Sequence, residues 1–183
     1  ALDIIIQAIS GMLAITGQPG GPPSRVGIPI SDLSGGVFSS SGILAALYDR
    51  ERTGEGRRIE LSMFDSMLSL LSYMGTMWLT NRELPTPQGT KHEYTVPWQA
   101  FKTSDSYVVI AARQDIFWEK VCGVIDSEEL RSDARFKTNQ KRVDNKEILI
   151  PLLEAIFEKQ TTEFWLEQLR EAGVPASPVN NLD

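Results

Sequence analysis

An irregular segment divides the chain and limits the folds that it can adopt. Residues 84–97 contain three prolines and one glycine, and their apolar residues follow neither the helical nor the alternating strand period. A segment of this kind is typical of a linker or an active-site loop. We therefore expect one domain in residues 1–81, a linker in 82–97 and a second domain in 98–183.

The part before this segment has the pattern of an α/β domain. Residues 3–16 are mostly apolar and fit a helix or a mixture of strand and helix. The Gly/Ser-rich residues 31–36 predict a turn that starts an apolar helix, and Gly54 ends it. Apolar and polar residues then alternate over 58–63, as in a half-buried strand, before a helix rich in Leu and Met over 64–80.

The part after the irregular segment is predicted to begin with a β-hairpin. Residues 98–102 and 107–111 favour strand, and the polar spacer between them places Asp105 in the turn. Asp144 and Glu147 have the spacing of a capping pair for one of the helices that follow. Neither half has enough strands to close a sheet, so we expect further chain or a partner to complete it. Three helices are expected, near residues 114–125, 144–158 and 161–172.

Composition and charge exclude several classes of function. The net charge of -6 argues against a nucleic-acid partner, because phosphate binding requires a basic surface. We expect no membrane partner, since no apolar stretch is predicted to reach the ~20 residues of a membrane span. Cys122 is the single cysteine, so the chain offers neither an internal disulfide nor a metal-ligand spacing, and we expect no metal site. A cytoplasmic location fits this composition, mitochondrial and peroxisomal locations stay open, and both ends of the chain resemble cuts through a longer protein.

Three side chains are candidates for chemistry. Asp65 follows the predicted strand at the start of a helix, where a carboxylate can attack an activated acyl group or can simply cap the helix. Asp32 lies in the turn at the other helix start, where anions are favoured, although an ordinary cap has the same sequence. His92, the single histidine, lies in the irregular segment and is either a general base or an exposed surface residue.

A set of short motifs runs through the chain in a definite order. It comprises DIIIQAISG (3–11), TG (16–17), GPP (21–23), SDLSGG (31–36), GILAAL (42–47), RTGEG (52–56), SMFD (62–65), PWQAF (97–101) and GVPASPVN (173–180). No single motif is specific. Taken in order over essentially the whole chain, they resemble the family III CoA-transferases, which include formyl-CoA transferase and carnitine CoA-transferase.

The resemblance implies a CoA-transferase with Asp65 as its catalytic nucleophile. The ionised carboxylate would attack an acyl-CoA thioester and form a mixed anhydride. The released thiolate would convert the anhydride into an aspartyl-CoA thioester, which the acceptor acid then attacks. A nearby helix N-terminus would stabilise the charge on the carboxylate. The partners implied are an acyl-CoA and a small carboxylic acid, with coenzyme A as a substrate and no permanently bound cofactor.

The resemblance also implies sites for CoA and for the acceptor. Oxalate-using members have a run of glycines where this chain has residues 91–95. That departure argues against formyl-CoA:oxalate exchange and leaves His92 as a candidate substrate contact. The segment that matches the family's contact with the CoA acyl arm is predicted to bind through Asp32, Leu33, Ser34, Gly35 and Gly36.

The fold that the resemblance implies is an α/β fold in an interlocked homodimer. Each chain of the family has a Rossmann-like large domain built from both chain ends and a small α/β domain between them. Its members are considerably longer than this chain. Residues 1–81 would be the end of the first large-domain piece, and residues 98–183 the small domain and return linker. We expect this stretch alone to be inactive, because most groups that hold the CoA adenine and phosphates would lie outside it.

Two other functions stay open. An α-methylacyl-CoA racemase of the same family needs an acid and a base on opposite faces of the α-carbon. Its His and Glu positions are Leu2 and Gln114 in this chain, and neither side chain exchanges a proton at neutral pH. A non-catalytic subunit would keep the fold without the chemistry. Loss of the nucleophile is its usual sign, whereas Asp65 is present.

Overall fold

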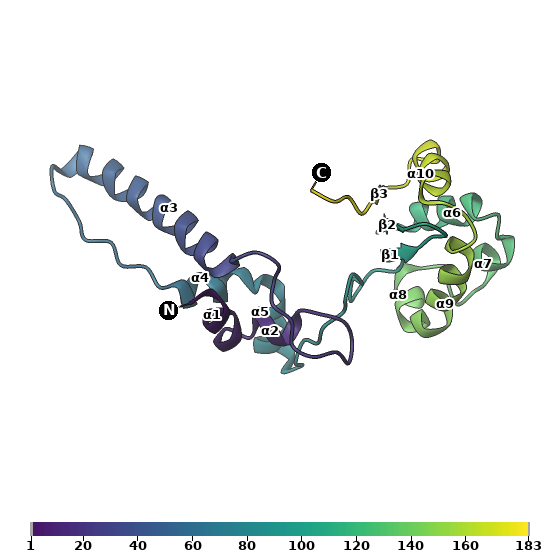
Figure 1. Cartoon of the computed structure of the whole chain (residues 1–183), viewed down its shortest axis with the longest axis horizontal. Coiled ribbons are helices and arrows are strands. Elements are labelled where there is room, and N and C mark those ends of the chain that lie inside the picture. The colour runs from purple at the N-terminus through teal and green to yellow at the C-terminus, as the bar shows by residue number, and fades with distance from the viewer. Residues whose placement is uncertain (1, 183) are drawn as a thin grey trace. The chain divides into compact units, whose positions relative to one another are not determined.

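The computed structural model describes residues 2–182 and contains two compact units (Figure 1). Unit 1 is Ala1–Gly89 and unit 2 is Thr90–Asp183. The division between them falls in a stretch, residues 82–97, that contains neither helix nor strand. Chain with this many prolines cannot extend a helix or a sheet ladder, which explains why a break occurs here.

The regular elements in the described part of unit 1 are helices, joined by stretches that contain neither helix nor strand. Its long helix ends at Gly54, whose φ of 74° is the left-handed conformation that glycine adopts without strain. The predicted helix over 64–80 is split in two, because Ser72 has a φ of 50° that no continuous helix accommodates. The helices are α1 (Asp3–Ile9), α2 (Met12–Ile15), α3 (Ile30–Thr53), α4 (Met63–Leu70) and α5 (Ser72–Asn81).

Two predictions for unit 1 are wrong. Residues 58–63 do not form a strand, because a strand requires a neighbouring backbone and the described part of unit 1 supplies none. Residues 31–36 are not a turn but the first turns of α3. Close packing explains a glycine in this helix: a Cβ at Gly35 would come within 3.3 Å of the Met63 side chain. Small residues thus let α3 approach the chain that leads into α4.

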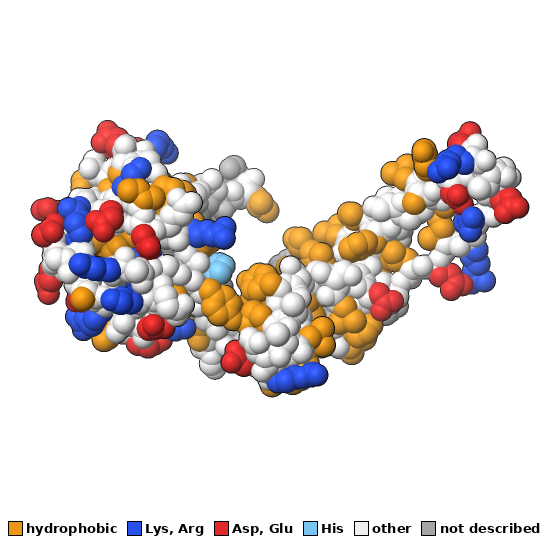
Figure 2. All heavy atoms as spheres, turned by 180° about the vertical axis from the view of Figure 1, so that it is seen from behind, with side chains coloured by type: hydrophobic (Ala, Val, Ile, Leu, Met, Phe, Trp, Pro, Cys, Tyr) orange, Lys and Arg blue, Asp and Glu red, His pale blue; other side chains and the backbone are white. Residues whose placement is uncertain are grey.

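Helix α3 buries small side chains and exposes large ones. Its buried residues are Ser31, Ser34 and Gly35, whereas Val37 and Leu44 are each 67% exposed. Figure 2 shows hydrophobic side chains gathered along this helix. Helix α3 has 24 residues, and an 18-residue window within it has a mean hydropathy of 1.2. By length and composition alone it could cross a membrane, contrary to the prediction that no stretch reaches that length. Core helices of soluble proteins meet the same two criteria.

Unit 2 contains the sheet. The predicted hairpin is confirmed, with strands β1 (Trp98–Lys102) and β2 (Tyr107–Ala111) paired antiparallel and Asp105 in the connecting turn. A third strand, β3 (Ala176–Pro178), pairs antiparallel with β2, so the order is β1-β2-β3. It was not expected from the sequence, because three residues are too few to show an alternating pattern.

The helices of unit 2 follow the predicted positions with two additions. The capping pair Asp144 and Glu147 is wrong: Asp144 is the last residue of one helix, and Asn145 precedes the next without a side-chain capping bond. The three predicted helices are α6 (Asp115–Val124), α9 (Lys146–Phe157) and α10 (Thr162–Glu171), and the short α7 (Glu128–Ser132) and α8 (Asn139–Asp144) lie between them.

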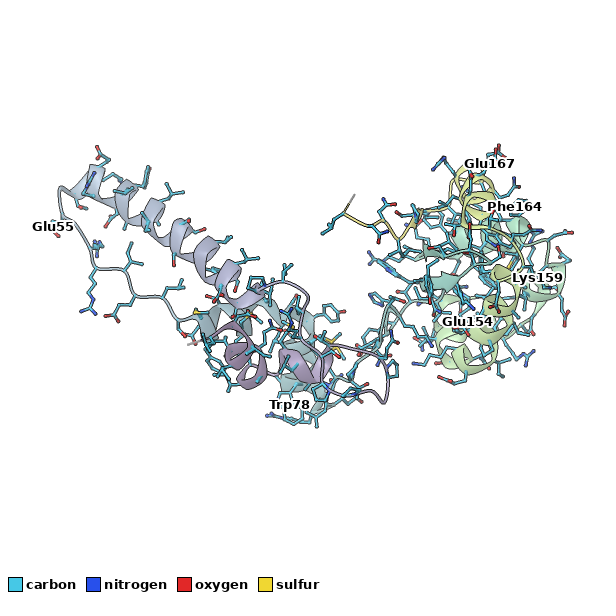
Figure 3. All side chains as sticks on the ribbon, viewed as in Figure 1. Glu55, Trp78, Glu154, Lys159, Phe164 and Glu167 are labelled. Carbon is cyan, nitrogen blue, oxygen red and sulfur yellow. The ribbon has the colours of Figure 1, made fainter. Side chains whose placement is uncertain are left out.

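The core of unit 2 lies between the sheet and these helices. Helix α9 shows how it forms: Leu149, Leu153 and Phe157 recur at helical spacing and are fully buried, whereas Glu154 points to solvent (Figure 3). The Phe157 ring packs 4.9 Å, centroid to centroid, from the rings of both Phe101 and Trp165. Helix and sheet therefore share one continuous apolar core.

Candidate active site

Asp65 lies in the first turn of α4 but does not cap it. The capping residue is Ser62, whose Oγ accepts the backbone N–H of Asp65 at 3.2 Å. The Asp65 side chain is exposed, and within residues 2–182 its carboxylate makes no hydrogen bond or ion pair. Because Ser62 takes the capping role, the carboxylate stays free at the positive end of the helix.

Contacts of the two residues that follow Asp65 hold its backbone in place. Ser66 Oγ donates to the carbonyl oxygen of Ser62 at 2.9 Å, which tightens the first turn of α4. Met67 is fully buried, and its sulfur lies 3.8 Å from Ser34 Oγ on α3. These contacts tie α4 to α3, so Asp65 is an exposed side chain on an anchored helix.

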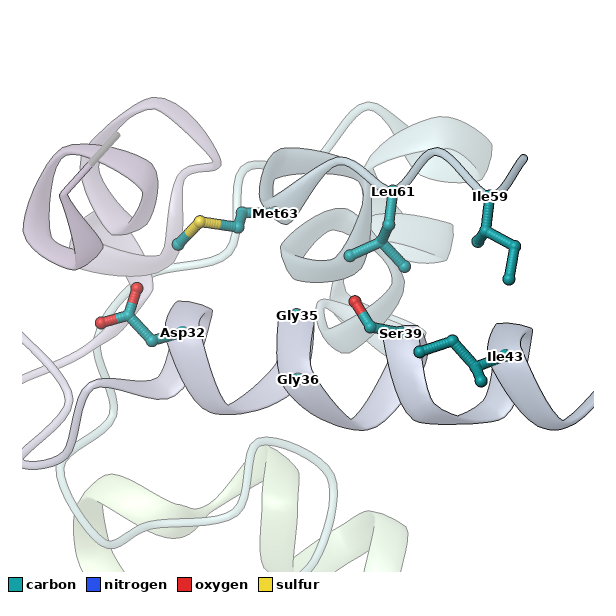
Figure 4. A pocket seen from close by; sticks show the side chains of 8 residues that line it. All are labelled: Asp32, Gly35, Gly36, Ser39, Ile43, Ile59, Leu61 and Met63. Carbon is teal, nitrogen blue, oxygen red and sulfur yellow. The ribbon is translucent and has the colours of Figure 1, made fainter.

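A groove with a volume of about 550 Å³ lies between α3 and the chain that leads into α4, and Met63, the first residue of α4, lines it (Figure 4). Of the residues predicted to bind CoA, Asp32, Gly35 and Gly36 line it together. Leu33 and Ser34 do not: Leu33 is half exposed elsewhere on the helix, and Ser34 is buried against α4. The other lining residues are Ser39, Ile43, Ile59, Leu61 and Met63.

The sequence reasoning missed most of this lining because it treated 31–36 as a turn. In a helix, the positions that follow Asp32 on one face are three, four, seven and eleven residues later. Those positions are Gly35, Gly36, Ser39 and Ile43, all of which line the groove. The helical period was therefore the signal that could have found them.

Asp3, which the sequence did not single out as a candidate, holds the start of α3 in place. Its Oδ1 accepts the backbone N–H of Ser31 at 2.9 Å and the Ser31 hydroxyl at 2.7 Å, which satisfies the start of α3. Its Oδ2 accepts from Gln7 Nε2 at 2.8 Å. Desolvation would raise the pKa of Asp3, but the hydrogen bonds from Ser31 and Gln7 outweigh it, so the pKa lies below its usual value.

His92 belongs to unit 2, and contacts with its neighbours fix its orientation. Its Nδ1 accepts the backbone N–H of Tyr94 at 3.1 Å, and the backbone N–H of His92 donates to the carbonyl oxygen of Trp98 at 3.0 Å. The imidazole centroid lies 4.8 Å from the Trp98 ring. The prediction of an exposed loop residue is thus too simple, because His92 is half-buried and held by its neighbours.

Cys122 and the two racemase positions provide no further catalytic group. Burial raises the pKa of the Cys122 thiol to about 12, so no thiolate nucleophile forms there at neutral pH. No cluster of three His, Cys, Asp or Glu side chains that could hold a metal ion occurs among residues 2–182. At the racemase positions, Leu2 is 73% exposed and Gln114 precedes α6 without a side-chain capping bond. Neither of these two side chains can exchange protons.

Comparison with known proteins places this site in a family. The family model described as CoA-transferase family III matches residues 1–183. The chain is 42% identical over 180 residues to an acetyl-CoA:oxalate CoA-transferase of Acetobacter aceti, covering 98% of this chain and 46% of that protein. It is 36% identical over 180 residues to the human succinyl-CoA:glutarate CoA-transferase, covering 98% of this chain and 41% of that protein. The chain thus spans about half the length of the curated relatives that it matches.

Solved structures agree with the sequence comparison. A CaiB/BaiF family protein from Brucella suis superposes on the whole chain with a TM-score of 0.86 and 33% identity, and the match covers 48% of that protein. The α/β class predicted for this chain is confirmed by that likeness, and the sheet that the structure shows is small and antiparallel. The chain belongs to CoA-transferase family III.

Proposed function

We propose that the whole protein transfers CoA from an acyl-CoA to a carboxylic acid, with Asp65 as the nucleophile. The observation that carries this proposal is the Asp65 carboxylate itself. It is exposed on an anchored helix, and Ser62 relieves it of the capping role. A carboxylate in that state can attack, whereas one engaged in a cap or an ion pair would first have to break those bonds.

The reaction divides into four acyl exchanges. An Asp65 oxygen attacks the thioester carbonyl, the C–S bond breaks, and CoA leaves as thiolate from a mixed anhydride. The thiolate attacks the Asp65 carbonyl carbon, which releases the donor's carboxylate and leaves an aspartyl-CoA thioester. The acceptor carboxylate displaces the thiolate to form a second anhydride. Finally the thiolate attacks the acceptor's carbonyl carbon, which forms the new acyl-CoA and restores Asp65. Each intermediate contains an activated acyl linkage at Asp65, either an anhydride or a thioester, so no external energy source is required.

The groove between α3 and the start of α4, the helix that carries Asp65, supports binding of the CoA acyl arm. Gly35 and Gly36 line the groove without a side chain, and Ile43 and Ile59 give it apolar walls. A pantetheine arm has amides and methylenes and suits a lining that is part polar and part apolar. Asp32 and Ser39, which also line the groove, provide side-chain oxygens that can accept an amide N–H of that arm.

The acceptor is proposed to be a dicarboxylic acid. The relatives are named for oxalate, glutarate and mesaconate, which are all dicarboxylates. Oxalate stays among the candidates, since a protein 42% identical to this chain is named for it, although the loop at residues 91–95 lacks a glycine run. We propose His92 as a contact for the acceptor, because its Nδ1 is already occupied and its Nε2 can face a ligand.

We also propose that the whole protein is a homodimer, as the resemblance implies. The large apolar side chains that α3 exposes, among them Val37 and Leu44, support a surface covered by more protein. Light scattering of the whole protein at two concentrations measures its mass, and a monomer at both would refute this part of the proposal.

Trapping the acyl-enzyme tests the mechanism. The whole protein is incubated with acyl-CoA and hydroxylamine, and peptide mass spectrometry locates any hydroxamate; the expected site is Asp65. Asp65→Asn should lower the transfer rate by about 10³-fold or more, because it removes the nucleophile. Asp126→Asn is the matched control, since this aspartate is exposed and outside the groove. An active Asp65→Asn variant without any hydroxamate would refute the proposal.

The same preparation separates the alternatives. A racemase would exchange the α-proton of a 2-methylacyl-CoA with solvent deuterium, and CoA transfer without such exchange eliminates it. A non-catalytic subunit would give neither hydroxamate nor transfer with any pair of acyl-CoA and dicarboxylate.

A further inference from the structure

The segment that carries His92 is bound along its length by a side chain of α8. Asn139 Nδ2 donates to the carbonyl oxygen of Tyr94 at 2.7 Å. Its Oδ1 accepts the backbone N–H of Val96 at 3.1 Å. One amide side chain thus satisfies a donor and an acceptor of a segment that lacks regular structure, which fixes the path of that segment.

Arg142 holds the same segment from inside the unit. Its side chain is fully buried, and Nε donates to the carbonyl oxygen of Val96 at 2.6 Å. The other two nitrogens donate to the carbonyl oxygen of Phe136 at 3.0 Å and to Asp115 Oδ1 at 2.8 Å. The guanidinium carbon also lies 5.3 Å from the Trp118 ring centroid. Every nitrogen of this planar group therefore has a fixed acceptor.

Asp115 joins the two holding side chains. The oxygen that accepts from Arg142 also accepts the backbone N–H of Asn139 at 2.9 Å. We call Arg142, Asn139 and Asp115 the α8 clamp. Because the three residues share one carboxylate oxygen, displacement of any one of them changes the position of the other two.

Stability of the core does not by itself explain a buried arginine. Desolvation lowers the pKa of Arg142, and Asp115 only partly offsets that effect. Apolar side chains of similar size often replace buried ion pairs without loss of stability. What such a side chain could not supply is a donor at Val96, so the specific contribution of Arg142 is the geometry of the segment.

That geometry determines the state of the His92 ring. The backbone N–H of Tyr94 is a donor only, so Nδ1 must present its lone pair. When it does, the imidazole is neutral and its proton is on Nε2. Within the described chain, Nε2 has no hydrogen-bond partner, and the Trp98 ring packs against the imidazole. A fixed N–H donor of this kind suits a carboxylate oxygen.

We propose that Arg142, with Asn139 and Asp115, is a positioning residue that fixes the Nε2–H tautomer of His92 toward the carboxylate of the acceptor acid. This inference rests on the proposed function only for the identity of the ligand. The clamp and the tautomer are properties of unit 2 alone.

Nuclear magnetic resonance of the whole protein tests the clamp without any activity. At about pH 8 an unperturbed imidazole is neutral, and its two nitrogen shifts report the tautomer. The His92 signals are assigned by their loss in His92→Asn. In the unmodified protein they should show one tautomer with the proton on Nε2. Arg142→Met should give averaged shifts, whereas Arg135→Met should leave them unchanged, because Arg135 is exposed and pairs with Asp133.

Kinetics then test the role in transfer. Arg142→Met and Asn139→Ala should each lower kcat/KM for the acceptor acid by about tenfold, the loss expected from a misplaced contact. Neither should change kcat/KM for the acyl-CoA donor more than about twofold. His92→Asn combined with Arg142→Met should lose no more than the larger single loss, because both act through one contact. Asn139→Ala keeps the test valid if Arg142→Met fails to fold, since it removes no buried charge.

The outcomes are distinct. A single unchanged tautomer in both clamp variants would overturn the positioning role, whatever the activity. Equal losses for donor and acceptor would also overturn it, because they indicate general damage to the fold. If the unmodified protein transfers no CoA, the proposed function fails, and the tautomer measurement still decides whether the clamp acts on His92.

Discussion

Unit 1 and unit 2 have similar lengths but differ in how they bury apolar side chains. Unit 2 encloses a continuous core in which Trp118, Leu153 and Phe157 are fully buried. Among the described residues of unit 1, the buried hydrophobic side chains are Ile6 and Met67. One unit therefore stabilises itself by burial, and the other exposes the surface that burial would normally remove.

This difference indicates which part of the chain depends on other protein for its stability. The proposed nucleophile lies in unit 1, and the best-defined polar network, the α8 clamp, lies in unit 2. The relatives are about twice the length of this chain. We infer that the helices around Asp65 obtain much of their stability from protein outside residues 1–183, whereas the surroundings of His92 do not.

Separating the units should give the largest effect. Residues 90–182 alone should unfold cooperatively in urea, because their core is self-contained. Residues 1–89 alone should show no cooperative transition, since Ile6 and Met67 are too little buried area to offset the conformational entropy. Circular dichroism at increasing urea concentration measures both. A sharp transition for residues 1–89 would contradict the comparison.

Two adjacent leucines sharpen the comparison within one helix. Leu153 is fully buried and Leu152 is 44% exposed, so the same change tests burial alone. Leu153→Ala should lower the free energy of unfolding of unit 2 by about 2–5 kcal/mol, through lost transfer energy and a cavity. Leu152→Ala should change it by less than about 1 kcal/mol.

A third leucine extends this test to unit 1. Leu44 is 67% exposed, so Leu44→Ala should not measurably change the unfolding of residues 1–183. In a protein of the relatives' full length the same change should be destabilising, because we expect that surface to be covered. If Leu44→Ala had an equally small effect on the unfolding of residues 1–183 and of the full-length protein, α3 would be a solvent-facing helix.

The sequence predicted the elements of unit 2 better than those of unit 1, for a physical reason. In unit 2 the backbone hydrogen bonds are made within the unit, and its apolar faces are buried against each other. Local pattern and structure therefore agree for the strands at 98–102 and 107–111 and for the three longer helices. Residues 58–63 have a strand pattern, but a strand requires a partner outside the segment. Pattern alone could not show that the partner was missing.

The candidate site was predicted in part. Asp32, Gly35 and Gly36 do come together in the groove, while Leu33 and Ser34 do not line it. Asp3 could not have been found by spacing, because its bonds to Ser31 join residues 28 positions apart. The α8 clamp was beyond the sequence for the same reason, since helix patterns report which face is apolar and not which polar groups meet.

The smallest expected effect is on the pH dependence of the stability of unit 2, which should differ from that of unit 1. Hydrogen bonds from the Thr162 N–H, the Thr162 hydroxyl and the Thr103 hydroxyl hold the pKa of Asp105 below its usual 3.8. Because the folded pKa is the lower one, the stability that Asp105 contributes is fully present above about pH 4. It is lost as the pH falls through the folded pKa.

Asp105→Asn should therefore lower the urea midpoint of unit 2 at about pH 6 and leave it nearly unchanged below the folded pKa. Asp3→Asn is the matched control, since its pKa is also lowered but by bonds within unit 1. It should not move the midpoint of unit 2 at any pH, because that unit has a core of its own. A midpoint difference for Asp105→Asn that is the same at both pH values would show that its bonds act through shape and not through charge. A shift with Asp3→Asn would show that the two units unfold as one.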